Sequence, residues 1–266
     1  MIQYIVDAFA EQLFEGNPAA ICVLDQWIED DLMLKIAQEN NLSETAFTVK
    51  EGNGYRLRWF TPGGEIDLCG HATLATAFVI MNYVDKTLNN ITFQTLSGEL
   101  IVKKNQDLYE IQFPSYSLIS IEVTKDMEKA IGFRPLEAWM GRDLVCVLQN
   151  EEQVESATPD LQKTKELPGM LLHVTAPSAV FDCVSRSFAP KFNIPEDPVC
   201  GSGHCHIAPL WAQKLKKDKI IARQASRRGG TLQCKINNDR VELAGKAVLF
   251  AIAELFVTNN KRNVDE

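Results

Sequence analysis

Two stretches about half the chain apart carry the same pattern. Residues 58–70 read RWFTPGGEIDLCG and residues 186–201 read RSFAPKFNIPEDPVCG. Both contain Arg-x-Phe-x-Pro, a short gap, Glu-x-x-x-Cys-Gly, and then a helical segment. A repeat over this distance predicts two similar halves, each placing a Cys-Gly turn at the start of a helix. Coincidence between two strand–turn–helix junctions is the alternative.

Hydrophobic patterning gives the same two halves. Residues 69–84 are apolar nearly all round, which predicts a helix buried inside a sheet, and a second long helix is expected near 201–216. Short strand-like runs surround both helices, and Pro114–Val123 is the best linker. We therefore predict an α+β fold with halves at 1–115 and 116–266. About ten C-terminal residues are expected to pack back on the first half.

Charge and composition exclude several classes of protein. The net charge is −8, which argues against nucleic-acid binding, because that needs a basic patch. The longest apolar stretch, 244–257, is interrupted by Lys246 and Glu254, so no membrane span is expected. The first residues lack the pattern of a signal peptide. Seven cysteines, an odd number, favour reduced thiols and a cytoplasmic location.

The Cys-Gly turns predict the chemistry of a ligand. If the halves are related by a pseudo-twofold axis, both helix starts face one cleft between them. The first backbone N–H groups of a helix are unpaired and carry a partial positive charge. We therefore expect a small anionic substrate, such as a carboxylate, with Gly70 and Gly201 at the two helix starts.

A metal site is the weakest interpretation of the segment EDPVCGSGHC, 196–205. Cys200 and His204 are four residues apart and share a helix face, whereas Cys205 and His206 project in other directions. None of the usual zinc-ligand spacings is present, so no metal is expected. His204, Cys205 and His206 are not predicted to be functional.

The two cysteines of the repeat suggest paired thiols. A cysteine at a helix N-terminus has a lowered pKa and can act as a base. Cys69 and Cys200, facing each other, would suit a racemase in which one thiol removes a proton and the other returns one. Two small buried side chains that fill space near a tight turn are the alternative.

Carboxylates and an imidazole offer a second set of acid/base groups. His71 comes two residues after Cys69, and Ser202 comes two residues after Cys200. Different polar groups therefore occupy equivalent places at the two helix starts. Asp197 precedes Cys200 and is expected to accept a hydrogen bond from His71 or from the substrate. Glu44 is a candidate general acid/base, although its position alone indicates only a polar residue leading into an apolar strand.

Several motifs, in chain order, resemble the PhzF-like family, whose fold is that of diaminopimelate epimerase. They are VDAF and FEGNPAA within 6–20, NNLSETAF at 40–47, RWFTP at 58–62, LCGHATLA at 68–75, FAP at 188–190 and EDPVCGSGHC at 196–205. The resemblance implies two pseudo-symmetric halves, each a β-barrel-like sheet around a central helix, with the active site between them. It also implies a homodimer and a cofactor-independent isomerase that moves a proton on a small carboxylated substrate.

The resemblance also assigns roles to residues. Glu44 of the LSE motif is the implied general acid/base, assisted by His71 and Asp197. The implied substrate-binding residues are Asn17, Gly70, Gly201 and Ser202.

One departure from the phenazine enzyme keeps other functions open. Both Cys69 and Cys200 are cysteines here, as in diaminopimelate epimerase, although His71 replaces the asparagine that follows Cys-Gly there. A two-thiol amino-acid racemase or epimerase is therefore an alternative. A binding protein that has kept the fold and lost catalysis is a third hypothesis.

Overall fold

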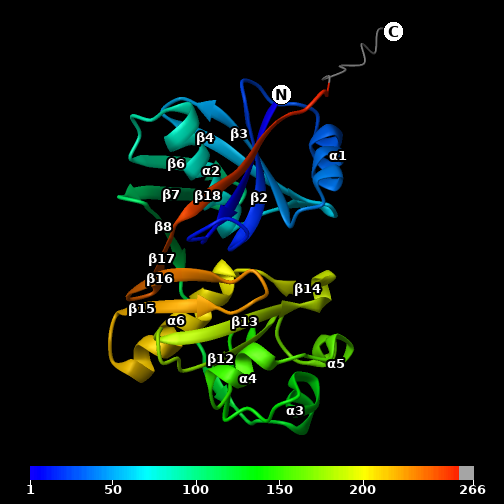
Figure 1. Cartoon of the computed structure of the whole chain (residues 1–266), viewed down its shortest axis with the longest axis vertical. Coiled ribbons are helices and arrows are strands. Elements are labelled where there is room, and N and C mark those ends of the chain that lie inside the picture. Colours follow the sequence, from blue (N-terminus) through cyan, green and yellow to red (C-terminus); the bar gives the residue numbers. More distant parts are fainter. Residues whose placement is uncertain (258–266) are drawn as a thin grey trace.

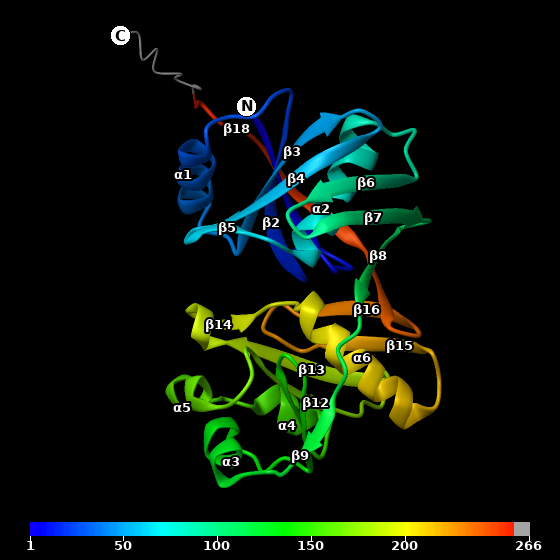
Figure 2. The ribbon, with the colours of Figure 1, turned by 180° about the vertical axis from the view of Figure 1, so that it is seen from behind.

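The computed structural model describes residues 1–257 and has the predicted mixed α+β architecture. Two halves lie one above the other, and in each a curved sheet wraps around one long helix (Figures 1 and 2). The central helix is α2 (Gly70–Val79) in the first half and α6 (Gly201–Leu215) in the second. Both helices begin where the sequence places them, directly after a cysteine.

The first half is a mostly antiparallel sheet with helix α1 (Asp30–Asn40) on its outside. Only the pairings β2–β3 and β4–β6 are parallel in this half. Its strands are β1 (Ile2–Ala8), β2 (Asn17–Leu24), β3 (Glu44–Glu51), β4 (Gly54–Thr61), β5 (Gly64–Ile66), β6 (Asn90–Thr95), β7 (Gly98–Asn105) and β8 (Leu108–Pro114).

The second half repeats this plan with shorter strands. Its strands are β9 (Ile119–Ile121), β10 (Glu137–Met140), β11 (Leu144–Val147), β12 (Leu172–Ala176), β13 (Cys183–Ala189), β14 (Ile194–Asp197), β15 (Lys219–Gln224), β16 (Gly230–Asn237) and β17 (Arg240–Gly245). The sequence analysis missed three short helices, α3 (Lys125–Ile131), α4 (Glu151–Ser156) and α5 (Leu161–Glu166). The expected linker is only partly irregular, because β9 lies within it and pairs with β10.

The two sheets are joined edge to edge. Strand β8 of the first half pairs antiparallel with β17 of the second, from Arg240↔Pro114 to Gly245↔Tyr109. The chain then returns to the first half as β18 (Ala247–Glu254), which pairs with β1. Of the C-terminal residues expected to pack on the first half, 258–266 lie outside the described residues. The boundary at residue 115 stays a prediction.

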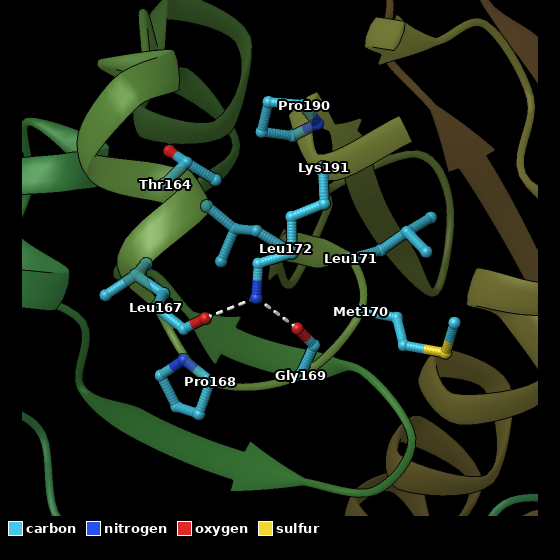
Figure 3. A pocket seen from close by; sticks show the side chains of 9 residues that line it. All are labelled: Thr164, Leu167, Pro168, Gly169, Met170, Leu171, Leu172, Pro190 and Lys191. Atoms are coloured by element: carbon cyan, nitrogen blue, oxygen red, sulfur yellow. Dashed lines mark hydrogen bonds between the residues drawn. The ribbon is translucent and has the colours of Figure 1, made fainter. Parts of the chain in front are cut away.

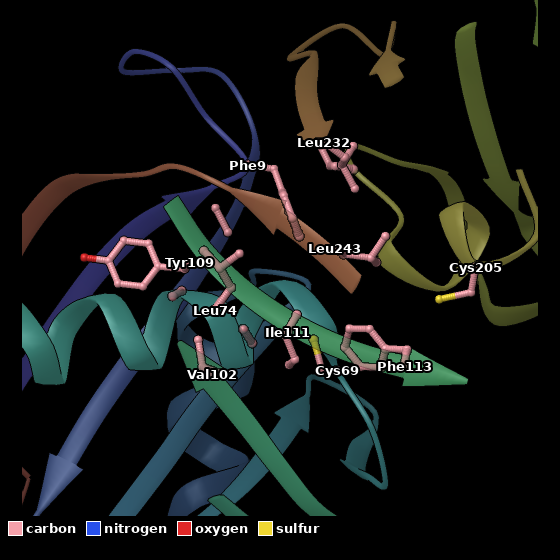
Figure 4. Close-up of a cluster of buried hydrophobic side chains, with 14 of the residues drawn as sticks. Phe9, Cys69, Leu74, Val102, Tyr109, Ile111, Phe113, Cys205, Leu232 and Leu243 are labelled. Carbon is pink, nitrogen blue, oxygen red and sulfur yellow. The ribbon is translucent and has the colours of Figure 1, made fainter. Parts of the chain in front are cut away.

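Helix α2 is buried on all sides, as its composition predicts. Most of its residues are inaccessible, and a π-helical turn (Ile80–Val84) extends it to the end of the predicted segment. In Figure 4, Leu74 of α2 packs beside Ile111 and Phe113 of β8, in a core that continues to Leu243 of β17 in the other half. Among residues 1–257, no helix is both long and apolar enough to cross a membrane.

The junction strands press against both helix starts. A Cβ atom on Gly70 would lie 3.2 Å from the Phe113 ring, and one on Gly201 would lie 3.7 Å from Leu243 Cδ1. The closer approach at Gly70 leaves little room for any side chain there. Glycine therefore lets the start of α2 pack tightly against the junction.

The repeated motif forms the same contact twice. Arg58 Nε lies 2.7 Å from Glu65 Oε1, and Arg186 Nε lies 2.7 Å from Glu196 Oε1. In each half, the arginine and the glutamate of the motif are therefore paired across two antiparallel strands, β4–β5 or β13–β14. The motif that predicts two halves is thus a structural element that fixes the strand pair before each helix.

Candidate active site

The parallel pair β2–β3 places two polar side chains at the same end of the first sheet. Ala19 is opposite Glu44, so Asn17 and Glu44 both lie at the start of their strands. Helix α2, which contacts both strands, begins at this end and brings His71 beside them. Glu44 is buried, although its local sequence indicates only a polar residue that leads into an apolar strand.

Glu44, His71 and Cys69 form a buried group. His71 Nε2 lies 2.9 Å from Glu44 Oε2, and His71 Nδ1 lies 3.5 Å from Cys69 Sγ. The Glu44–His71 approach is not aligned as a hydrogen bond, so both atoms remain without a partner. Both side chains are nearly buried, with 11% of the Glu44 side chain and 8% of the His71 side chain still exposed.

Charge in this group is concentrated on Glu44 and His71. Burial opposes an imidazolium, but negative charge on Cys69 and Glu44 and the contact of His71 with Cys69 outweigh it, so the pKa of His71 lies well above its ordinary value. Burial, and then the Glu44 charge, raise the pKa of the Cys69 thiol. Because that thiol is then neutral near pH 7, we assign the positive charge on His71 chiefly to Glu44.

Asp197 joins this group from the second half. Asn17 Nδ2 donates to Asp197 Oδ1 at 2.8 Å and to the Val199 carbonyl at 3.1 Å. Asp197 does not accept the hydrogen bond expected from His71. It accepts one from Asn17 instead, and His71 Nε2 faces Glu44. Burial raises the pKa of Asp197, opposed by the His71 charge and reinforced by Glu44.

The unpaired atoms mark this region. Within residues 1–257, four buried side-chain nitrogen or oxygen atoms have no hydrogen-bond partner, and three of them are Asn17 Oδ1, Glu44 Oε2 and His71 Nε2. Such groups are costly unless a ligand or water satisfies them. Their concentration where three predicted site residues meet identifies this region as the candidate active site.

The two cysteines are both N-caps, but their thiols are not activated. Cys200 Sγ accepts a hydrogen bond from Gly203 N at 3.3 Å, whereas Cys69 makes no side-chain cap to its helix. Burial, and then the Asp197 charge, raise the pKa of Cys200 well above its ordinary value. The expectation of lowered thiol pKa values is therefore wrong, because loss of hydration outweighs the helix terminus.

Ser202 faces a residue that the sequence analysis passed over. Arg142, in the turn between β10 and β11, donates from Nη2 to Ser202 Oγ at 3.0 Å. The sequence signal was present: Arg142 and Asp143 lead into an apolar strand, as Glu44 does. His206, which was set aside as non-functional, belongs to the same network through Asp143.

Comparison with known proteins decides the family. The family model for phenazine biosynthesis-like proteins (PhzC-PhzF) matches residues 6–253. The chain belongs to the PhzF-like family. It is 44% identical to an uncharacterized isomerase of Pseudomonas aeruginosa, over 92% of this chain and 95% of that protein. A crystal structure of a PhzF family protein from Enterococcus faecalis matches with a TM-score of 0.95 and 49% identity, covering 96% of this chain and 99% of that one.

More distant proteins share the fold. A probable proline racemase from Agrobacterium radiobacter, 10% identical, superposes with a TM-score of 0.63 over 98% of this chain and 95% of that one. This likeness shows the diaminopimelate epimerase-like fold alone. With relatives named as isomerases, the PhzF-like chain is an isomerase.

A second polar cluster of the PhzF-like isomerase surrounds Asp143. Its carboxylate accepts hydrogen bonds from Arg142 Nε at 3.0 Å and Nη2 at 2.6 Å, and from His173 Nε2 at 3.1 Å. His173 Nδ1 bonds Ser187 Oγ, while His206 Nε2 accepts from Asp143 N and its Nδ1 lies 3.0 Å from the Ser202 carbonyl. All of these ring nitrogens are therefore satisfied.

Two groups in the described part of the chain have the spacing of metal ligands: Glu44–Cys69–His71 and Asp143–His173–His206. In the second, the hydrogen bonds just described engage the atoms that would bind an ion. In the first, metal binding would require a thiolate and a neutral imidazole, whereas the raised pKa values of Cys69 and His71 favour the protonated forms. Acid/base chemistry fits this first group better.

A separate hollow lies beside α5 and the 3-10 turn Pro190–Phe192 (Figure 3). Of the nine residues that line it, only Lys191 is charged. Its ammonium donates to the carbonyl groups of Leu167 and Gly169. Lys191 therefore stabilises the surrounding turn, and this hollow is not assigned to the active site.

Proposed function

We propose that this PhzF-like protein is a cofactor-independent isomerase that moves a proton on a small carboxylated metabolite, with Glu44 as general acid/base. The observation that supports this role is the buried Glu44–His71 pair, whose facing atoms have no hydrogen-bond partner. A carboxylate held in this way is available to take a proton from a bound molecule.

The proposed reaction has two proton transfers. Glu44 takes a proton from a carbon next to an electron-withdrawing group and becomes neutral, while the substrate becomes a carbanion or enolate. The same carboxylic acid then returns a proton at a different position, so no net charge is gained. The cationic His71 stabilises the negative charge that moves from Glu44 to the substrate.

The remaining site residues hold the substrate in this proposal. The first-turn amide groups at Gly70 and Gly201 have no partner within their helices and suit an anion. Asn17 Oδ1 can accept a hydrogen bond from the substrate, because its amide nitrogen is already engaged with Asp197. Asp197 is a positioning residue that fixes Asn17 across the junction.

The experiment is a screen of small carboxylates for deuterium incorporation from D₂O. The arms are wild type, Glu44→Gln, and Glu51→Gln as a matched control, since Glu51 lies at the exposed far end of the same strand. We expect Glu44→Gln to lose about 10²- to 10⁴-fold in exchange rate and Glu51→Gln to match wild type. Undiminished exchange in Glu44→Gln would sink the proposal.

The structure affects the alternatives differently. A two-thiol racemase would need Cys69 and Cys200 to change protonation state, and burial holds both thiols in the neutral form. A catalytically idle binding protein has no need for the unpaired Glu44 and His71 atoms, which cost stability when buried. Glu44 is therefore the favoured base.

A further inference from the structure

Arg142 has contacts on several sides although its side chain is still 31% exposed. One edge of its guanidinium, Nε and Nη2, binds the Asp143 carboxylate with two hydrogen bonds. Its plane lies over the Tyr116 ring, with Cζ 5.0 Å from the ring centroid. Tyr116 in turn stacks on His206, at 4.2 Å between ring centroids.

The opposite edge of Arg142 has only neutral partners. Nη2 donates to Ser202 Oγ at 3.0 Å, and Nη1 donates to Tyr116 Oη at 3.3 Å. These bonds and the two to Asp143 use four of the five N–H donors of a guanidinium. Both hydroxyl groups can rotate to donate, so an incoming carboxylate could accept from them and from Arg142 together.

The second edge of Arg142 lies at the start of helix α6. Ser202 lies in the first turn of α6, where the equivalent residue of α2 is His71. The charge of Arg142 therefore lies beside the start of α6 and is opposed by Asp143 on one edge only, whereas the charge of His71 in the other half faces Glu44. Arginine presents two parallel donors that match the two oxygens of a carboxylate.

We propose that Arg142, together with Ser202, binds the carboxylate of the substrate and so selects small carboxylic acids. The substrate carboxylate then lies at the second half, and the reacting carbon lies toward Glu44. Only this placement of the reacting carbon rests on the reaction proposed above. Asp143 and Tyr116 are positioning residues that hold the guanidinium plane.

Calorimetric titration with succinate tests this binding role, with succinamide as the uncharged comparison ligand. The variants are Arg142→Lys, which keeps a charge beside Asp143 but loses the second edge, and Ser202→Ala. Arg58→Lys is the matched control, because Arg58 also binds carboxylates with two hydrogen bonds and lies over aromatic rings. We expect Arg142→Lys to weaken succinate binding about 10- to 100-fold, and Arg58→Lys to leave it unchanged.

Stability must be separated from binding. Thermal melting of each variant shows whether the fold is kept, and the double variant Arg142→Met with Asp143→Asn removes both charges should Arg142→Lys unfold. A folded Arg142→Lys or double variant that binds succinate like wild type overturns the proposal. Wild type that binds succinate no more tightly than succinamide overturns it as well.

The binding experiment and the deuterium-exchange experiment test the two proposals separately. Succinate binding that depends on Arg142, in a protein that shows no deuterium exchange with any carboxylate, supports the carboxylate site and refutes the isomerase proposal. If deuterium exchange depends on Glu44 but succinate binding does not depend on Arg142, the isomerase proposal is supported and the carboxylate site is refuted.

Discussion

Two polar clusters occupy equivalent places in the two halves. The candidate-site cluster (Asn17, Glu44, Cys69, His71) lies at the parallel pair β2–β3, where Ala19 is opposite Glu44. The network cluster (Arg142, Asp143, His173, His206) lies at the parallel pair β11–β12, where Val145 is opposite His173. Counting from these paired residues, Glu44 corresponds to His173 and Asn17 to Asp143.

The clusters differ in how completely their hydrogen bonds are made. In the network cluster, Asp143 and both histidines are fully buried and engaged. In the candidate-site cluster, Glu44 and His71 face each other with unpaired atoms. Buried polar groups that satisfy one another stabilise a fold, whereas groups left without partners are available to a ligand. The equivalent position therefore carries a hydrogen-bonded Asp143–His173 pair in the second half and the incompletely paired Glu44 and Asn17 of the candidate active site in the first.

Removing one member of the network cluster should have the largest effect on stability. Asp143→Ala leaves Arg142 and His173 without their anion, and we expect a loss of about 3–5 kcal/mol in the free energy of unfolding. Glu44→Gln should cost less than Asp143→Ala, because Glu44 faces only His71, which can release its proton when the opposing charge is gone. Urea unfolding of both variants measures the contrast, and equal losses would remove the distinction between the clusters.

The charge states of two histidines sharpen the same contrast. The pKa of His71 is raised in the folded protein, so the protonated imidazole stabilises the fold. This stabilisation is complete below the ordinary histidine pKa, about 6.5, and is lost as pH rises through the raised value. Burial, and then repulsion from His173, lower the pKa of His206 to about 4, so it stays neutral near pH 7.

Titration of the imidazole proton resonances by NMR separates the two histidines. We expect His71 to stay protonated above pH 6.5 and to titrate at lower pH in Glu44→Gln, because the opposing charge is gone. His206 should be unaffected by that substitution. A wild-type His71 that titrates at or below the ordinary histidine value would contradict the proposed ion pair.

The smallest expected effect is at a helix start. In Cys200→Ser the hydroxyl can accept the Gly203 N–H that the thiol accepts now, so stability should stay within about 1 kcal/mol of wild type. Proton exchange should also be retained, since a neutral thiol is not the base. A collapse of exchange in a folded Cys200→Ser would favour the two-thiol alternative and argue against Glu44.

The sequence predicts the architecture well and the site unevenly. The all-apolar segment 69–84 predicts a buried helix because no face of it can meet water, and the repeat predicts the second helix start at Cys200. Glu44 is one candidate acid/base among several from the residues alone, and only the resemblance to the PhzF-like family singles it out. Arg142 and Asp143 carry the same local signal, polar residues before an apolar strand, and were missed because no motif singled them out.

Periodicity and turn chemistry are local properties, so the amino-acid sequence is enough to predict the two halves, their central helices and the segments that carry polar groups. Which of those polar groups have hydrogen-bond partners depends on contacts that exist only in the folded chain. Asn17 meets Asp197, and Arg142 meets Ser202, across many intervening residues. A hydrogen bond depends on distances between atoms that are far apart in the sequence, so the unpaired atoms of Glu44 and His71 become visible only in the folded structure.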